Sequence, residues 1–235
     1  MKNAILFFVI FTLYFSNSLS AQLGRETTGL DLALDQVMSY SKLMSNKANS
    51  KQQLIGLPYL YEKWSRGDVS FKKEVVKFDN VKVDLLKNQL EIKIKGQEKI
   101  LDKTFFSSFT IINPETGELI LFVNAEEYSL NGEKLIGFLQ KVEIGDYEIL
   151  THNTARIASS GRSSISETGG SAQRVVKKKK IYISKDGKVY KVKRKKDVYK
   201  VFTKNKKRTK EYMKDNKINI KKEEDLVKLA LYYKS

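Results

Sequence analysis

Apolar and polar residues alternate along the middle of the chain, the pattern of β-strands that bury one face. Residues 81–86 and 90–95 alternate on either side of a turn at residues 87–89. Turns that contain Gly, Pro, Asn or Asp bound further predicted strands at 105–112, 118–123, 136–144 and 147–152. Short strands with frequent turns predict a mainly β fold, either an antiparallel sandwich or a half-open barrel.

Helical periodicity is confined to the two ends of the chain. Residues 28–44 place Leu30, Leu34, Val37 and Met44 on one stripe, which predicts an amphipathic N-terminal helix. At the other end, residues 222–233 predict a helix, in which Glu223, Glu224 and Asp225 suit the N-terminal end. Shorter helices are predicted at 195–202 and 205–217, so a small C-terminal helical segment follows the strands.

The pair Asp186-Gly187 predicts a β-hairpin with a two-residue type I′ turn. This register places Ile183 opposite Tyr190 and Ile181 opposite Val192, so one side of the hairpin is apolar. The other side pairs Ser184 with Val189, Tyr182 with Lys191, and Lys180 with Lys193. We therefore expect the hairpin to lie on a core and to keep many of its lysines in water.

The N-terminus has the pattern of a secretory signal. Lys2 precedes an apolar run at 4–15, small polar residues follow at 16–21, and cleavage is expected after Ser20 or Ala21. The run is shorter than the roughly 20 residues of a membrane-spanning helix, so no span is expected after cleavage. The chain has no cysteine, which excludes a lipoprotein anchor, disulfides and thiolate sites. The expected location is the periplasm or the outer surface.

Five segments follow from these patterns. They are a signal peptide at 1–21, an amphipathic helix and loop at 22–53, an antiparallel β domain at 54–153, a flexible Ser- and Gly-rich loop at 154–173, and a basic β-hairpin with C-terminal helices at 174–235.

The positive charge of the chain is concentrated in the last of these segments. Residues 174–235 hold 24 Lys and Arg and 7 Asp and Glu, so their net charge is 24 − 7 = +17. This equals the net charge of the whole sequence. Such asymmetry suggests a surface that faces a polyanion. The candidate polyanion-binding residues are Lys177, Lys178, Lys179, Lys180, Lys191, Lys193, Arg194, Lys195, Lys196, Lys206, Lys207 and Arg208.

The sequence does not identify the partner of this segment. In an exported protein the available anions are glycans, lipid headgroups and cell-wall polymers, so an unknown envelope protein or an anionic polymer is expected and nucleic acid is not. The alternative is that these lysines only form a solvated face, since surfaces rich in Lys are often merely solubilising.

Catalytic patterns are weak. His152 is the single histidine, so a histidine-cluster metal site is excluded and any triad would depend on this residue. The S-x-x-K pattern at 39–42 lacks its companion motifs, and Arg66-Gly67-Asp68 is interpreted as a turn. Acidic residues such as Glu126, Glu127, Glu143, Asp146 and Glu148 are scattered, which leaves a carboxylate-dependent hydrolase as an alternative. No cofactor is expected, and the protein is not expected to be an enzyme.

Four stretches together resemble a group of exported, uncharacterised proteins of Bacteroidetes-type bacteria. These stretches are "GLPYLYEKWSRGDVSF", "FDNVKVDLLKNQLEIKIKG", "YISKDGKVYKVKRKKDVYKVF" and "INIKKEEDLVKLALYY". The resemblance implies export and assigns no activity. The sequence therefore predicts an exported, non-catalytic envelope or cell-surface protein that acts as a binding module.

Overall fold

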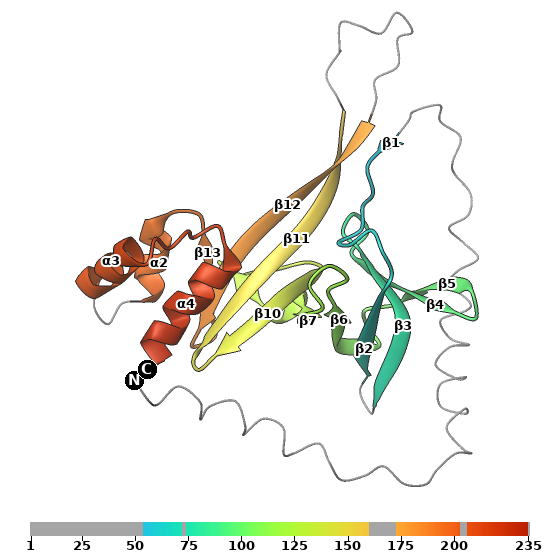
Figure 1. The fold of residues 1–235 in the computed structure, drawn as a ribbon, viewed down its shortest axis with the longest axis horizontal. Coiled ribbons are helices and arrows are strands. Elements are labelled where there is room, and N and C mark those ends of the chain that lie inside the picture. Colours follow the sequence, from blue (N-terminus) through green and yellow to red (C-terminus); the bar gives the residue numbers. More distant parts are fainter. Residues whose placement is uncertain (1–53, 72–73, 160–172, 203–205, 235) are drawn as a thin grey trace, which may run out of the picture. The chain divides into compact units, whose positions relative to one another are not determined.

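The computed structural model describes residues 54–71, 74–159, 173–202 and 206–234, and it is mainly β (Figure 1). The strands are β1 Leu54–Ile55, β2 Ser65–Phe71, β3 Val75–Asp84, β4 Gln89–Ile94, β5 Gln97–Leu101, β6 Phe106–Ile112, β7 Leu119–Asn124, β8 Ser129–Leu130, β9 Glu133–Lys134, β10 Phe138–Ile144, β11 Tyr147–Ser159, β12 Gln173–Lys185 and β13 Lys188–Val192. The helices are η2 Ala125–Glu127, α2 Lys195–Val201, α3 Lys206–Asp215 and α4 Glu223–Lys234.

The strands form one open sheet in the order β1-β12-β11-β10-β7-β6-β2-β3-β4-β5, with β13 paired to the other end of β12. All pairs are antiparallel except β1 with β12, and β8 and β9 form a separate small hairpin. The predicted mainly β, antiparallel fold with C-terminal helices is thus confirmed. The main sheet is a single layer rather than a sandwich, and it does not close in the part of the chain that the structure describes. The predicted N-terminal helix lies outside the described residues.

The sheet curls so that the β3–β4 turn reaches β11. The backbone N–H of Ala155 donates to the carbonyl of Leu85 at 3.1 Å, and Leu85 in turn donates to Pro58 at 2.9 Å. Inside this curl the rings of Phe106, Phe109, Phe122 and Phe138 pack with centroid separations of 4.9–5.8 Å. The alternating residues of β6, β7 and β10 that face inward therefore form a buried aromatic core.

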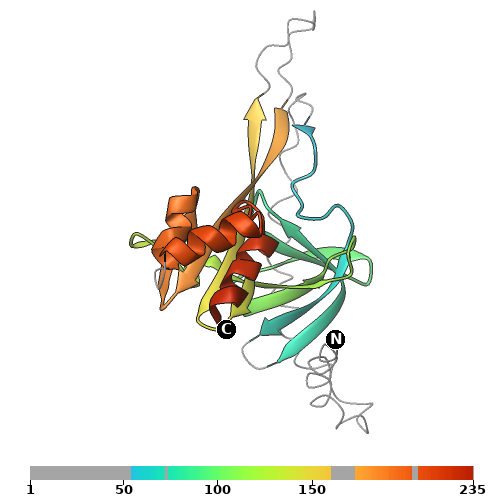
Figure 2. The ribbon, with the colours of Figure 1, turned by 60° about the vertical axis from the view of Figure 1, so that its left-hand side comes forward.

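The other end of the sheet is covered on both faces. Helix α2 lies against β13 and α4 against β10 and β11 (Figures 1 and 2). Phe202 and Leu226 pack with Ile149, Ile181 and Ile183, and Met213 of α3 belongs to the same cluster. On the opposite face the segment with η2, β8 and β9 covers a second cluster, whose buried members are Val123, Ala125, Leu139, Leu150 and Tyr182.

The predicted β12–β13 register is confirmed, with Ile183 opposite Tyr190 and Tyr182 opposite Lys191. Asp186 and Gly187 have φ of 50° and 72°, as a type I′ turn requires. The ladder ends at Val192, so it does not include the expected pair of Lys180 and Lys193. Tyr182 and Ser184, expected on the wet side, are both buried, and the β8–β9 segment covers Tyr182.

Two other predictions are wrong. Residues 154–159 were expected in a loop, but they continue β11 because β12 pairs with it along its whole length. Arg66-Gly67-Asp68 was expected to be a turn, but it lies within β2 between β3 and β6. Gly67 is required there because a Cβ atom would overlap the carbonyl oxygen of Thr110. No helix in the described ranges has the length and apolarity to cross a membrane.

Candidate functional site

The tertiary structure brings two basic runs together at the point where β13 leaves the sheet. Lys177–Lys180 lie in the middle of β12, and the last paired residue of β13, Val192, stands opposite Ile181. The chain that continues into α2 therefore starts beside Lys180. We call the resulting set the basic junction: Lys177, Lys178, Lys179, Lys180, Lys191, Lys193, Arg194, Lys195 and Lys196.

The side chains of the basic junction are exposed, apart from the half-buried Lys191. None of them has a carboxylate within 4.0 Å among the residues that the structure places. Asp197 follows them, but its carboxylate accepts the backbone N–H groups of Lys193 and Arg194 at 3.1 and 2.9 Å and so caps α2. The charges of Lys179 and Arg194 act on the carboxylates of Glu223 and Asp197, but no residue of the junction forms an ion pair within 4.0 Å in the described ranges.

The pKa of Lys191 reflects the positive charge of the basic junction. Burial, together with the positive charges of Lys193 and Lys180, lowers the pKa of the Lys191 amino group. Strand register explains the contact, because Lys191 stands opposite Tyr182 and so shares the face of Lys180. A bound anion would relieve this repulsion.

The remaining candidates, Lys206, Lys207 and Arg208, open α3. The Nε of Arg208 donates to the hydroxyl of Tyr232 in α4, and its guanidinium lies 4.8 Å from the centre of that ring. Arg208 therefore holds α3 against α4, a structural function that its place in a basic run did not indicate.

An open pocket of about 460 Å³ lies on the β8 side of the sheet, where the β10–β11 and β12–β13 turns meet. The two turns come together because Tyr147 pairs with Lys185 in the antiparallel β11–β12 ladder. The acidic residues that appear scattered in sequence gather here: Glu127, Glu143, Asp146, Glu148 and Asp186 line the pocket with Tyr128 and Ser184. Of these, Asp186 was interpreted only as a turn residue.

A polar network occupies one wall of this pocket. Lys141 lies 3.1 Å from Glu143 and 3.0 Å from Glu148, and the hydroxyl of Tyr128 donates to Glu148 at 3.3 Å. Burial alone would raise the pKa of Glu148, but hydrogen bonds from Lys141 and Ser184 lower it overall. Burial and the Glu148 carboxylate raise the pKa of Tyr128 to about 12.

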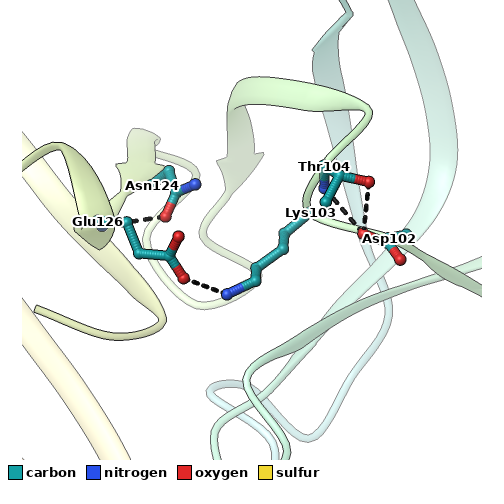
Figure 3. A network of polar contacts seen from close by, with 5 residues as sticks. All are labelled: Asp102, Lys103, Thr104, Asn124 and Glu126. Carbon is teal, nitrogen blue, oxygen red and sulfur yellow. Dashed lines mark hydrogen bonds and ion pairs between the residues drawn. The ribbon is translucent and has the colours of Figure 1, made fainter.

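The segment that precedes Tyr128 is anchored from the β5–β6 connection (Figure 3). Lys103 forms an ion pair with Glu126, whose backbone N–H donates to Oδ1 of Asn124 at 3.1 Å. Asp102 accepts hydrogen bonds from the backbone and hydroxyl of Thr104, each at 2.8 Å. This network positions η2, and with it Glu127 in the pocket wall.

His152 lies in the interior of β11, not at a strand end as expected, and is only 7% exposed. Neither ring nitrogen has a hydrogen-bond partner of normal geometry within the described ranges. Burial lowers the pKa of His152, Lys180 lowers it further, and the backbone of Ile136 acts in the opposite direction. The imidazole of His152 is thus enclosed within the fold.

Two other carboxyl groups have a raised pKa, and both lie outside the pocket. Burial raises the pKa of Glu223, which accepts hydrogen bonds from Gln140 and Thr151. Burial also raises the pKa of Glu91, against the hydrogen bond from Tyr59, with Asp84 nearby. Within the placed residues no group of three or more His, Cys, Asp or Glu is arranged to hold a metal ion.

Comparison of the chain with protein-family models, with curated proteins and with solved structures finds no significant match. The resemblance to exported Bacteroidetes-type proteins stays a prediction. The S-x-x-K pattern at 39–42 lies outside the described residues.

Proposed function

We propose that this protein is an exported, non-catalytic binding module of the cell envelope that captures an anionic partner through the basic junction. The observation that carries the proposal is the meeting of two basic runs without a carboxylate partner in the described ranges. Positive charge that a fold gathers but does not neutralise raises the local concentration of anions.

Export rests on the apolar run at 4–15 and its flanking residues. The anions that such a protein meets are acidic proteins, glycans and lipid headgroups.

A carboxylate-dependent hydrolase is supported less well. The acidic pocket offers Glu143 and Glu148, but Lys141 forms an ion pair with each of them, and its hydrogen bond helps to lower the pKa of Glu148. A general acid needs a carboxyl group that keeps its proton near neutral pH. The carboxyl groups with a raised pKa, Glu91 and Glu223, lie outside the pocket and have hydrogen-bond partners.

The test compares two triple variants of the chain from Gln22 to Ser235, the expected mature form. One replaces Lys180, Lys193 and Lys195 with Gln, and the control replaces the exposed Lys77, Lys214 and Lys221 with Gln. The probes are an acidic peptide, a uronate polysaccharide and vesicles of anionic phospholipid, each at low and high salt.

We expect at least one probe to bind, to weaken with salt because counterions compete, and to lose about tenfold in affinity only in the junction variant. Equal loss in both variants would mean that net charge alone attracts the probe. That result, or no binding of any probe, would overturn the proposal.

A further inference from the structure

One stretch of β12 has an edge with no partner strand among the described residues. On one side β12 pairs with β11 along its whole length. On the other side β1 pairs with Gln173 and Arg174, and β13 pairs with residues 181–185. In the part of the chain that the structure describes, no strand pairs with residues 175–180 on that side. At about 3.3 Å per residue this gap spans roughly 20 Å.

The strand register determines which backbone groups face the gap. Lys185 and Lys188 flank the type I′ turn and therefore exchange both of their hydrogen bonds, as do alternate pairs along the ladder. Counting back by twos from Lys185, Lys179 and Lys177 direct their N–H and C=O groups to the same side, where β13 no longer lies. Lys178 and Lys180 direct theirs to β11.

The open edge coincides with the lysine run. Lys177–Lys180 are all exposed, and β12 contains no acidic residue. Lysines on an edge strand discourage pairing with other chains, because most strands cannot neutralise them. The same charge leaves one class of strand able to pair, namely a strand that carries acidic side chains.

We propose that residues 175–180 of β12 form a docking slot for an extended, acidic peptide segment of another protein, which adds a strand between β1 and β13. This inference rests on the proposed function and specifies its partner. The backbone groups of Lys177 and Lys179 supply main-chain hydrogen bonds, and the lysines supply selectivity. Side chains alternate between faces, so the slot suits a segment with acidic residues on both faces.

The experiment separates strand pairing from charge. The variant Lys177→Pro/Lys179→Pro removes the two N–H groups that face the slot and leaves the ladder to β11 intact, since Pro is tolerated where the N–H faces away from the sheet. The matched variant Lys177→Gln/Lys179→Gln removes the same charges and keeps both N–H groups. The probe is a fluorescent synthetic peptide of Glu, Thr and Val, titrated by anisotropy, and circular dichroism checks both folds.

We expect the Pro variant to bind the peptide about tenfold more weakly than the Gln variant, because it loses two backbone hydrogen bonds. In the wild-type protein, peptide binding should slow amide hydrogen exchange at Lys177 and Lys179. A peptide with an N-methyl group at every residue keeps its charge but is blocked on both edges, so it should not give this protection. The exchange measurement tests the inference even if the Pro variant does not fold.

Equal affinities of the Pro and Gln variants, or absent protection at Lys177 and Lys179, would overturn the strand slot. So would tighter binding of the uronate polysaccharide or the anionic vesicles than of the peptide. In each of these cases salt-dependent binding at the basic junction would still support the proposed function. Absence of binding to every anionic probe would overturn both proposals.

Discussion

The side-chain Nε2 of Gln140 donates a hydrogen bond of 2.8 Å to Oε1 of Glu223 and so ties the first turn of α4 to β10. The other carboxylate oxygen of Glu223 accepts a hydrogen bond from Thr151 of β11. A single buried acidic residue thus connects the C-terminal helix to two neighbouring strands, on the face opposite the acidic pocket.

Replacement of Glu223 should separate the effects of its hydrogen bonds and its charge. Glu223→Ala leaves Gln140 and Thr151 without their partner, and we expect a loss of about 1–3 kcal/mol in the free energy of unfolding. Glu223→Gln preserves the bonds and should stay within about 1 kcal/mol of wild type at pH 7. Urea unfolding of the three proteins measures both values, and equal losses in the two variants would contradict this view.

The pH dependence of the same pair has a definite sign. Burial raises the pKa of Glu223 above its usual 4.5, so the folded protein binds the proton more readily than the unfolded chain. The free energy of unfolding of the wild type should therefore rise relative to that of Glu223→Gln as the pH falls from neutral toward 4.5. The increase should be complete below pH 4.5. A constant difference between the two proteins would be inconsistent with the buried carboxyl.

Lys141 should matter more for stability than an ordinary surface lysine. Its side chain is 18% exposed and contacts both Glu143 and Glu148, whereas that of Lys228 is 61% exposed and, among the residues that the structure describes, forms an ion pair only with Asp225. Lys141→Met should cost about 1–3 kcal/mol, because Glu148 then remains partly buried without its cation. Lys228→Met should cost at most about 0.5 kcal/mol. Chemical unfolding at pH 7 compares the two.

Acid should reduce the difference in stability between the wild type and Lys141→Met. The pKa of Glu148 is lowered from its usual 4.5, so the stability that this carboxylate contributes is present above that pH and is lost as the pH falls through its folded pKa. The gap between wild type and Lys141→Met should shrink below pH 4.5. A gap that persists in acid would assign the effect to lost packing.

His152 should make the protein sensitive to mild acid. Its pKa is lowered from 6.5 by burial and by Lys180, so below pH 6.5 the unfolded chain takes up a proton before the folded protein does. Stability should fall as the pH drops below 6.5, and His152→Phe should flatten this decline. Melting temperatures at pH 7.5 and 5.5 test the difference, and proton NMR of the single histidine follows its titration directly.

Gly67 should be intolerant of any side chain. A Cβ atom there would overlap the carbonyl oxygen of Thr110 in the neighbouring strand, so Gly67→Ala should cost about 2–4 kcal/mol. Gly117 has a φ of 75° and no neighbouring atom within 4 Å of an added Cβ, and Asn tolerates this conformation. Gly117→Asn should therefore cost less than about 1 kcal/mol. A mild effect at Gly67 would show that β2 and β6 can move apart.

The strands, the turns and the C-terminal helices were predictable because their signals are local. Asp186-Gly187 sets the register of its hairpin, since only residues that tolerate positive φ form a type I′ turn. The stripe of Leu226 and Leu229 likewise predicts α4, because a helix repeats its buried face every three to four residues.

The arrangement of those elements was decided by contacts between distant residues. Alternation in β11 and β12 does not specify that the ladder runs to Ser159, that Leu85 reaches Ala155, or that the β8–β9 segment buries Tyr182. The basic junction and the open edge at residues 175–180 exist only because β1 and β13 pair with opposite ends of one strand. Sequence determined that the lysines are there, and tertiary pairing determined which of their backbone groups have no strand beside them in the described part of the chain.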